Sequence, residues 1–114
     1  MSQNLELPSY ANLDAQEMAS SIGLNVKHIP ILVQSFTDES NGIVDKLISA
    51  ANNNDFDVIA NTAHSIKGSA GNLKFNEMYE LAKVVELSAK NKVVDFPYVQ
   101  AGESIKKAID SISL

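Results

Sequence analysis

Residues 56–73, FDVIANTAHSIKGSAGNL, contain the pattern that decides the fold. Apolar residues recur in this stretch at steps of three and four, which predicts an amphipathic helix with one buried seam. The seam consists of Phe56, Ile59, Ala63, Ile66, Ala70 and Leu73. Asp55 comes directly before the stretch, and aspartate is a preferred residue at a helix N-cap, so we expect the helix to begin there.

The same helical spacing extends outward over most of the chain, and the alternation typical of strands is missing. A short helix is predicted over residues 14–22, ended by Gly23, and a long helix over residues 27–51. Two more helices are predicted after the central stretch, with Asn76 and Asp95 as their N-caps.

Four longer helices joined by short connections indicate an all-α fold, namely an up-down antiparallel four-helix bundle with a short extra N-terminal helix. Residues 1–12 precede the first helix, and we expect them to form a flexible N-terminal segment. Residues 13–114 are expected to form a single domain. The initial Met1 and the length of one domain favour a free-standing protein.

The composition narrows the possible functions before any motif is considered. The 114 residues are 45% hydrophobic and 20% charged, as in an ordinary globular domain, and the formal net charge is −5. An acidic chain disfavours binding to nucleic acid and to anionic membranes, so neither is expected as a partner. Because cysteine, a signal peptide and a long apolar run are all missing from the sequence, we expect a cytoplasmic protein.

His64 is the candidate reactive residue of the central helix. At about 100° per residue it lies roughly 130° from the centre of the seam, so its imidazole is expected to be exposed. A neutral imidazole is a competent nucleophile near neutral pH. Lys67, one turn further on, could offset the charge of a phosphoryl group on that imidazole.

Small residues share the face of His64: Ala60 lies one turn before it, Gly68 one turn after it and Gly71 two turns after it. A glycine inside a helix costs about 1 kcal/mol relative to alanine, so two glycines so close together need a compensating reason. One reason is access for a bulky partner to the imidazole, and the other is close approach of a neighbouring helix. The two glycines alone do not distinguish between these two explanations.

The run over residues 63–73, AHSIKGSAGNL, resembles the signature of histidine-containing phosphotransfer (HPt) domains at nearly every position. A weaker resemblance extends from about Ile22 to the end of the chain. It implies a four-helix bundle with His64 as the phosphoacceptor and Lys67 as its electrostatic partner. It also implies receiver domains of response regulators and of hybrid sensor kinases as partners, because family members exchange phosphoryl groups with receiver aspartates.

The docking surface for a receiver is expected to comprise Ala60, Gly68, Gly71 and Lys74. The family often has glycine at the position of Lys74, so this lysine could add positive charge beside the site. The exposed site and acidic surface favour a monomer. We expect no cofactor or metal: the sequence contains no glycine-rich nucleotide loop and no Glu-x-x-His pair, so the phosphoryl group must come from a partner.

A second hypothesis is a non-catalytic helical adaptor that binds a partner helix through its small-residue face, and a third is a metal or cofactor protein. The other histidine, His28, is expected to have a surface or capping role. Charged residues of the fourth predicted helix are expected to form one exposed face, comprising Glu77, Glu80, Glu86, Lys83 and Lys90.

Overall fold

A computed structural model describes residues 5–114 of the chain. Its elements, in order, are α1 (Ala15–Ile22), η1 (Val26–His28, a 3-10 turn), α2 (Ile29–Asn52), α3 (Phe56–Asn72), α4 (Asn76–Lys90) and α5 (Tyr98–Asp110). Within the described part of the chain every regular element is helical, so the predicted all-α class is confirmed. None of these helices is long and apolar enough to cross a membrane.

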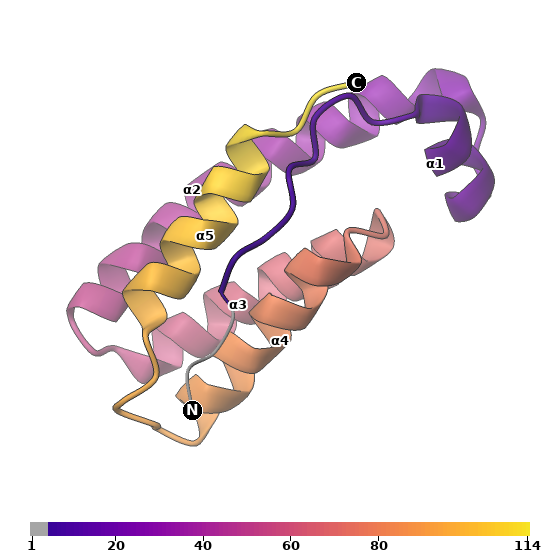
Figure 1. The fold of residues 1–114 in the computed structure, drawn as a ribbon. Coiled ribbons are helices and arrows are strands. Elements are labelled where there is room, and N and C mark those ends of the chain that lie inside the picture. Colours follow the sequence, from indigo (N-terminus) through magenta and orange to yellow (C-terminus); the bar gives the residue numbers. More distant parts are fainter. Residues whose placement is uncertain (1–4) are drawn as a thin grey trace.

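The four longer helices form two pairs that pack together. Helix α5 lies along α2, and α4 lies along α3, while α3 also packs against α2 (Figure 1). The short α1 lies at one end of the bundle, beside the start of α2 (Figure 1). Helix α3 therefore has two neighbours, and only part of its surface can reach solvent.

The buried surface of α3 is wider than the predicted seam. Ile59, Ala63 and Ile66 are fully buried as predicted. Ala60, however, is only 7% exposed, so its expected place on the open face of the helix is wrong. The reason is that α3 packs against helices on two sides, which buries residues at the margin of the seam as well as those at its centre.

Two of the predicted helix ends are observed, namely Gly23 after α1, with a left-handed φ of 83°, and the Asp55 N-cap of α3. The Asp14 side chain accepts hydrogen bonds from the backbone amides of Gln16 and Glu17 at the start of α1. The Asp55 carboxylate accepts one from the amide of Val58, 3.3 Å away, at the start of α3. Such caps satisfy amides that lack a partner within the helix.

The predicted caps of α4 and α5 are wrong. Phe75 and Pro97 occupy the N-cap positions instead of Asn76 and Asp95, and neither makes a side-chain capping bond. Phe75 is buried against the rings of Tyr10 and Phe36, so aromatic packing fixes the entry into α4. The local preference for a polar cap is overridden by this packing.

Residues 5–12 run along the bundle between α4 and α5 (Figure 1). The side chain of Tyr10 is buried, and its hydroxyl donates to Glu77 Oε1 and accepts from the amide of Met78, both at 3.3 Å. Its backbone amide donates to Ser111 Oγ at 2.9 Å. These contacts differ from the flexible segment expected over residues 1–12, of which residues 1–4 lie outside the described part.

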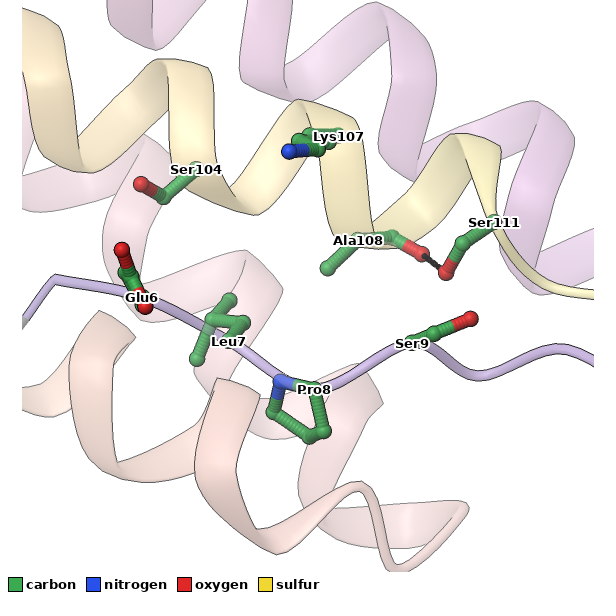
Figure 2. A pocket seen from close by; sticks show the side chains of 8 residues that line it. All are labelled: Glu6, Leu7, Pro8, Ser9, Ser104, Lys107, Ala108 and Ser111. Atoms are coloured by element: carbon green, nitrogen blue, oxygen red, sulfur yellow. Dashed lines mark hydrogen bonds between the residues drawn. The ribbon is translucent and has the colours of Figure 1, made fainter.

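The N-terminal segment over residues 5–12 and helix α5 line a pocket of about 410 Å³. Figure 2 shows Leu7 and Pro8 on one side of it and Ser104, Lys107 and Ala108 of α5 on the other. The segment thus fills part of the space between α4 and α5, which pack against each other less extensively than α3 and α4 do.

Candidate functional site

His64 lies on α3 with its side chain 67% exposed, as the helical period predicted. The preceding Ala63 is fully buried in the seam, so the imidazole projects from a backbone that is fixed by packing. A reactive group on a rigid helix is held more precisely than one on a loop. The Nδ1 atom of the ring lies 2.9 Å from a carboxylate oxygen of Glu86 on α4.

The exposed position predicted for Glu86 is wrong. Its side chain is only 3% exposed, although it was expected on a solvated face of α4. Three cationic or polar groups surround its carboxylate: Oε1 lies 2.7 Å from Lys67 Nζ, and Oε2 lies 2.9 Å from His64 Nδ1 and 3.0 Å from Lys90 Nζ. The packing of α4 against α3 buries the carboxylate, and the contacts with these three partners offset the free-energy cost of burying its charge.

A signal for this burial was available in the spacing. Glu86 follows Ala82 by four residues and precedes Ala89 by three, and both alanines are buried. Positions so spaced lie on the same side of a helix, so Glu86 borders the apolar stripe of α4.

The electrostatics of the cluster keep Glu86 ionised. Burial by itself would raise the pKa of this carboxyl, but hydrogen bonds from Lys67, Lys90 and His64 outweigh burial and lower it to about 2. The bond to Glu86 also raises the pKa of Lys67, which favours the ammonium form. Both groups are therefore charged near neutral pH.

An ionised carboxylate can only accept a hydrogen bond, which determines the tautomer of the histidine. The proton of the neutral imidazole must lie on Nδ1, where it is donated to Glu86 Oε2. The lone pair available for reaction then belongs to Nε2. Because the His64 side chain is largely exposed, the arrangement suits nucleophilic attack on a group presented from solvent.

The two glycines near His64 have different surroundings. A Cβ atom added to Gly68 would meet no heavy atom of a neighbouring element within 4 Å, so this position opens onto free space. A Cβ atom added to Gly71 would lie 3.2 Å from Cδ2 of Tyr79 on α4. Close helix packing therefore explains Gly71, whereas it gives no reason for Gly68.

Lys74 lies beyond the end of α3, in the turn that leads to α4. Its φ of 64° is left-handed, and its amide and that of Phe75 donate to the carbonyls of Gly71 and Ala70, at 3.2 Å and 2.9 Å. This is the helix ending that usually carries glycine. Lys74 lines a pocket together with residues of α1. It follows His64 by ten residues, which at 1.5 Å per residue is about 15 Å along the helix axis, so Lys74 is remote from the imidazole.

The remaining candidate, His28, is exposed at the junction of η1 and α2 and makes no side-chain capping bond. Within residues 5–114, no group of three or more histidine, aspartate or glutamate side chains could hold a metal ion.

The fold and site define a helical bundle that presents an exposed histidine beside two lysines and a buried carboxylate. The family model for the Hpt domain matches residues 31–113, which is more than half of the chain. The chain therefore belongs to the Hpt domain family, which carries out phosphotransfer in two-component signalling and interacts with receiver domains. No curated protein and no solved structure matches the chain significantly.

Proposed function

We propose that this protein is a phosphorelay intermediate. His64 accepts a phosphoryl group from the aspartyl phosphate of one receiver domain and passes it to the aspartate of another. The donor is a receiver domain of a hybrid sensor kinase, and the acceptor is that of a response regulator. The observation that carries the proposal is the hydrogen bond from Nδ1 of the exposed His64 to the buried Glu86 carboxylate, because it leaves Nε2 as the nucleophile.

In the forward step, the Nε2 lone pair attacks the phosphorus atom of the receiver's aspartyl phosphate. A nitrogen–phosphorus bond forms, the bond from phosphorus to the carboxylate oxygen breaks, and the aspartate leaves with the electron pair. No proton has to be removed, because Nε2 is unprotonated in this tautomer. The ring gains positive charge, which the Glu86 carboxylate at 2.9 Å from Nδ1 stabilises. The return step reverses these bond changes with a second aspartate.

Lys67 is proposed to bind the transferred phosphoryl group. Its side chain is 23% exposed and is held on the α4 side of His64 by the contact with Glu86. An ammonium has three N–H donors, so one can remain on Glu86 while another turns to a phosphoryl oxygen. The negative charge of the phosphoryl group is thereby partly neutralised.

Gly68 is proposed as the docking position that leaves room for the receiver. The open space at this glycine supports the proposal, since a side chain there would project beside the imidazole. Gly71, which packs against Tyr79, and the buried Ala60 contribute less to the surface that a receiver can reach. Lys74 is too far along the helix to contact a phosphoryl group on His64.

The bundle is proposed to follow an up-down antiparallel course through α2, α3, α4 and α5. Short connections over residues 53–55 and 73–75 support this course, because they allow successive helices only to turn back on one another. We also propose that the protein is a cytoplasmic monomer. Light scattering of the purified protein would measure the state of association.

The test is transfer of radiolabelled phosphate from a panel of phosphorylated receivers to the wild type, His64→Gln, Gly68→Gln and Gly42→Gln. Gly42 is the matched control: it is an exposed glycine within α2, and a Cβ atom there would also meet open space. The wild type and Gly42→Gln should take up label that is lost in acid and survives alkali. His64→Gln should take up none, and Gly68→Gln should be slowed at least tenfold.

A parallel reaction with phosphoramidate separates chemistry from docking. This small donor needs no protein surface, so it should phosphorylate His64 of Gly68→Gln as fast as His64 of the wild type. In His64→Gln the label at position 64 should be missing, and peptide mapping separates it from any label on the exposed His28. A folded wild type that takes label neither from the receiver panel nor from phosphoramidate would contradict the proposal. The helical adaptor would then be the better hypothesis, with His64→Gln expected to bind its partner normally.

A further inference from the structure

Lys90 is a second cation at the site, and its position differs from that of Lys67. It lies on α4, four residues after Glu86, and its Nζ atom is 3.0 Å from Oε2. The same oxygen accepts the hydrogen bond from His64 Nδ1 at 2.9 Å. Because both nitrogens lie within 3.0 Å of one oxygen atom, they are at most about 6 Å apart.

The exposure of Lys90 leaves its side chain room to turn. Its side chain is 59% exposed, against 23% for Lys67, so rotation about the bonds of its flexible stem meets solvent rather than packed atoms. The backbone of α4 need not shift for the ammonium to turn from Glu86 toward the outer side of the imidazole. Lys67, held by Oε1, approaches the cluster from α3 instead.

The balance of charges in the cluster favours a second cation beside His64. With a neutral His64, two ammonium groups face one carboxylate, so the site carries one positive charge in excess. A phosphoryl dianion on Nε2 adds two negative charges and the ring one positive charge, so this excess is cancelled, and the dianion would lie close to the buried carboxylate of Glu86. Like charges at such distances repel, and a single lysine cannot neutralise both anions.

We infer that Lys90 is a second phosphoryl-binding residue, which rests on Glu86 in the unmodified protein and contacts the phosphoryl group once His64 is phosphorylated. This inference depends on the proposed function, because it concerns the phosphorylated state of the same histidine. Glu86 acts as the acceptor that keeps this cation beside the imidazole before transfer.

The test measures the second ionisation of the phosphoryl group by ³¹P NMR. Wild type, Lys90→Met, Glu86→Gln and Lys83→Met are each phosphorylated with phosphoramidate and titrated between about pH 5 and pH 9. A cation about 5 Å away favours the dianion, so Lys90→Met should raise the titration midpoint by about 0.3–0.6 pH unit. Glu86→Gln removes a nearby negative charge and should lower the midpoint.

Lys83 provides the matched control, because it is an exposed lysine on the same helix, seven residues before Lys90 and about 10 Å away along the axis. Its replacement should move the midpoint by less than about 0.1 pH unit. A wild-type midpoint in Lys90→Met, or an equal rise in Lys83→Met, would overturn the inference while leaving the proposed function intact. A wild type that gives no phosphohistidine signal would refute the proposed function itself, and the inference with it.

Discussion

Glutamine in place of Glu86 is the substitution that tests the cluster most directly, because it removes one charge and keeps the size of the side chain. The carboxylate is 3% exposed and is bound by His64, Lys67 and Lys90. A charged hydrogen bond to a buried group contributes about 1.5–3 kcal/mol, and a solvated ion pair about 0.2–1 kcal/mol. The amide oxygen of glutamine recovers part of this, so we expect the free energy of unfolding to fall by about 2 kcal/mol at pH 7.

The loss of stability in Glu86→Gln should depend on pH, in a direction that the pKa of Glu86 determines. Hydrogen bonds lower the pKa of Glu86 from 4.5 to about 2 in the folded protein, against the effect of burial. The ionised carboxylate therefore stabilises the fold fully above about pH 4.5, and this stabilisation is lost as the pH falls toward 2. Linkage gives about 1.4 kcal/mol between pH 7 and pH 3.5, which solvent screening of the partly exposed lysines reduces to about 1 kcal/mol.

Urea denaturation followed by far-UV circular dichroism, at pH 7 and at about pH 3.5, measures both quantities. The difference between the wild type and Glu86→Gln should be about 2 kcal/mol at the higher pH and about 1 kcal/mol at the lower one, with an unchanged denaturant slope. Glu80→Gln is the control, because Glu80 is exposed on the same helix and should change stability by less than about 0.5 kcal/mol. A difference that stays constant across this pH range would refute an ionised carboxylate paired in the folded state.

The other predictions concern the backbone and the exposed face. Lys74→Gly and Lys92→Gly should each raise the free energy of unfolding by about 0.5–1 kcal/mol in urea denaturation. Both lysines have left-handed φ angles, of 64° and 53°, which glycine adopts without strain. A loss of stability in both variants would contradict those conformations. Gly68→Ala should stabilise the protein by up to about 1 kcal/mol in thermal unfolding, since its Cβ would meet open space. Gly102→Ala should instead destabilise it by about 1–3 kcal/mol, because its Cβ would lie 2.7 Å from a side-chain carbon of α2. His64→Gln should change stability by less than about 0.5 kcal/mol in the same assay, and a larger loss would mean that the imidazole supports the core.

Features that depend on a single helix could be predicted from the sequence. The steps of three and four over residues 56–73 located the seam of α3, and the same period placed His64 on the exposed side. Gly23 as the end of α1 and Asp55 as the cap of α3 were recognisable because each bonds to a backbone group only three or four residues away. The resemblance to HPt domains rested on the same short run, and the family match confirmed it.

Features that depend on contact between elements could not be predicted in this way. The burial of Ala60 at the margin of the seam and the aromatic N-cap at Phe75 both come from neighbours distant in the chain. Residues 5–12 gave no periodic signal, yet they pack between α4 and α5 through Tyr10, whose partner Ser111 is 101 residues away.

The sequence by itself determined the class of fold, the exposed histidine and the lysine one turn after it, because helical geometry relates residues within one helix by a fixed rotation and rise. Only the tertiary structure decided the chemistry around them. The packing of α4 against α3 brings Glu86 to Nδ1 of His64 across 22 positions of sequence, and places Lys90 on the same carboxylate oxygen. Packing also leaves Gly68 open and fills the space above Gly71 with Tyr79. The tautomer of the histidine and the charge of its site therefore follow from helix packing, which no single-helix pattern encodes.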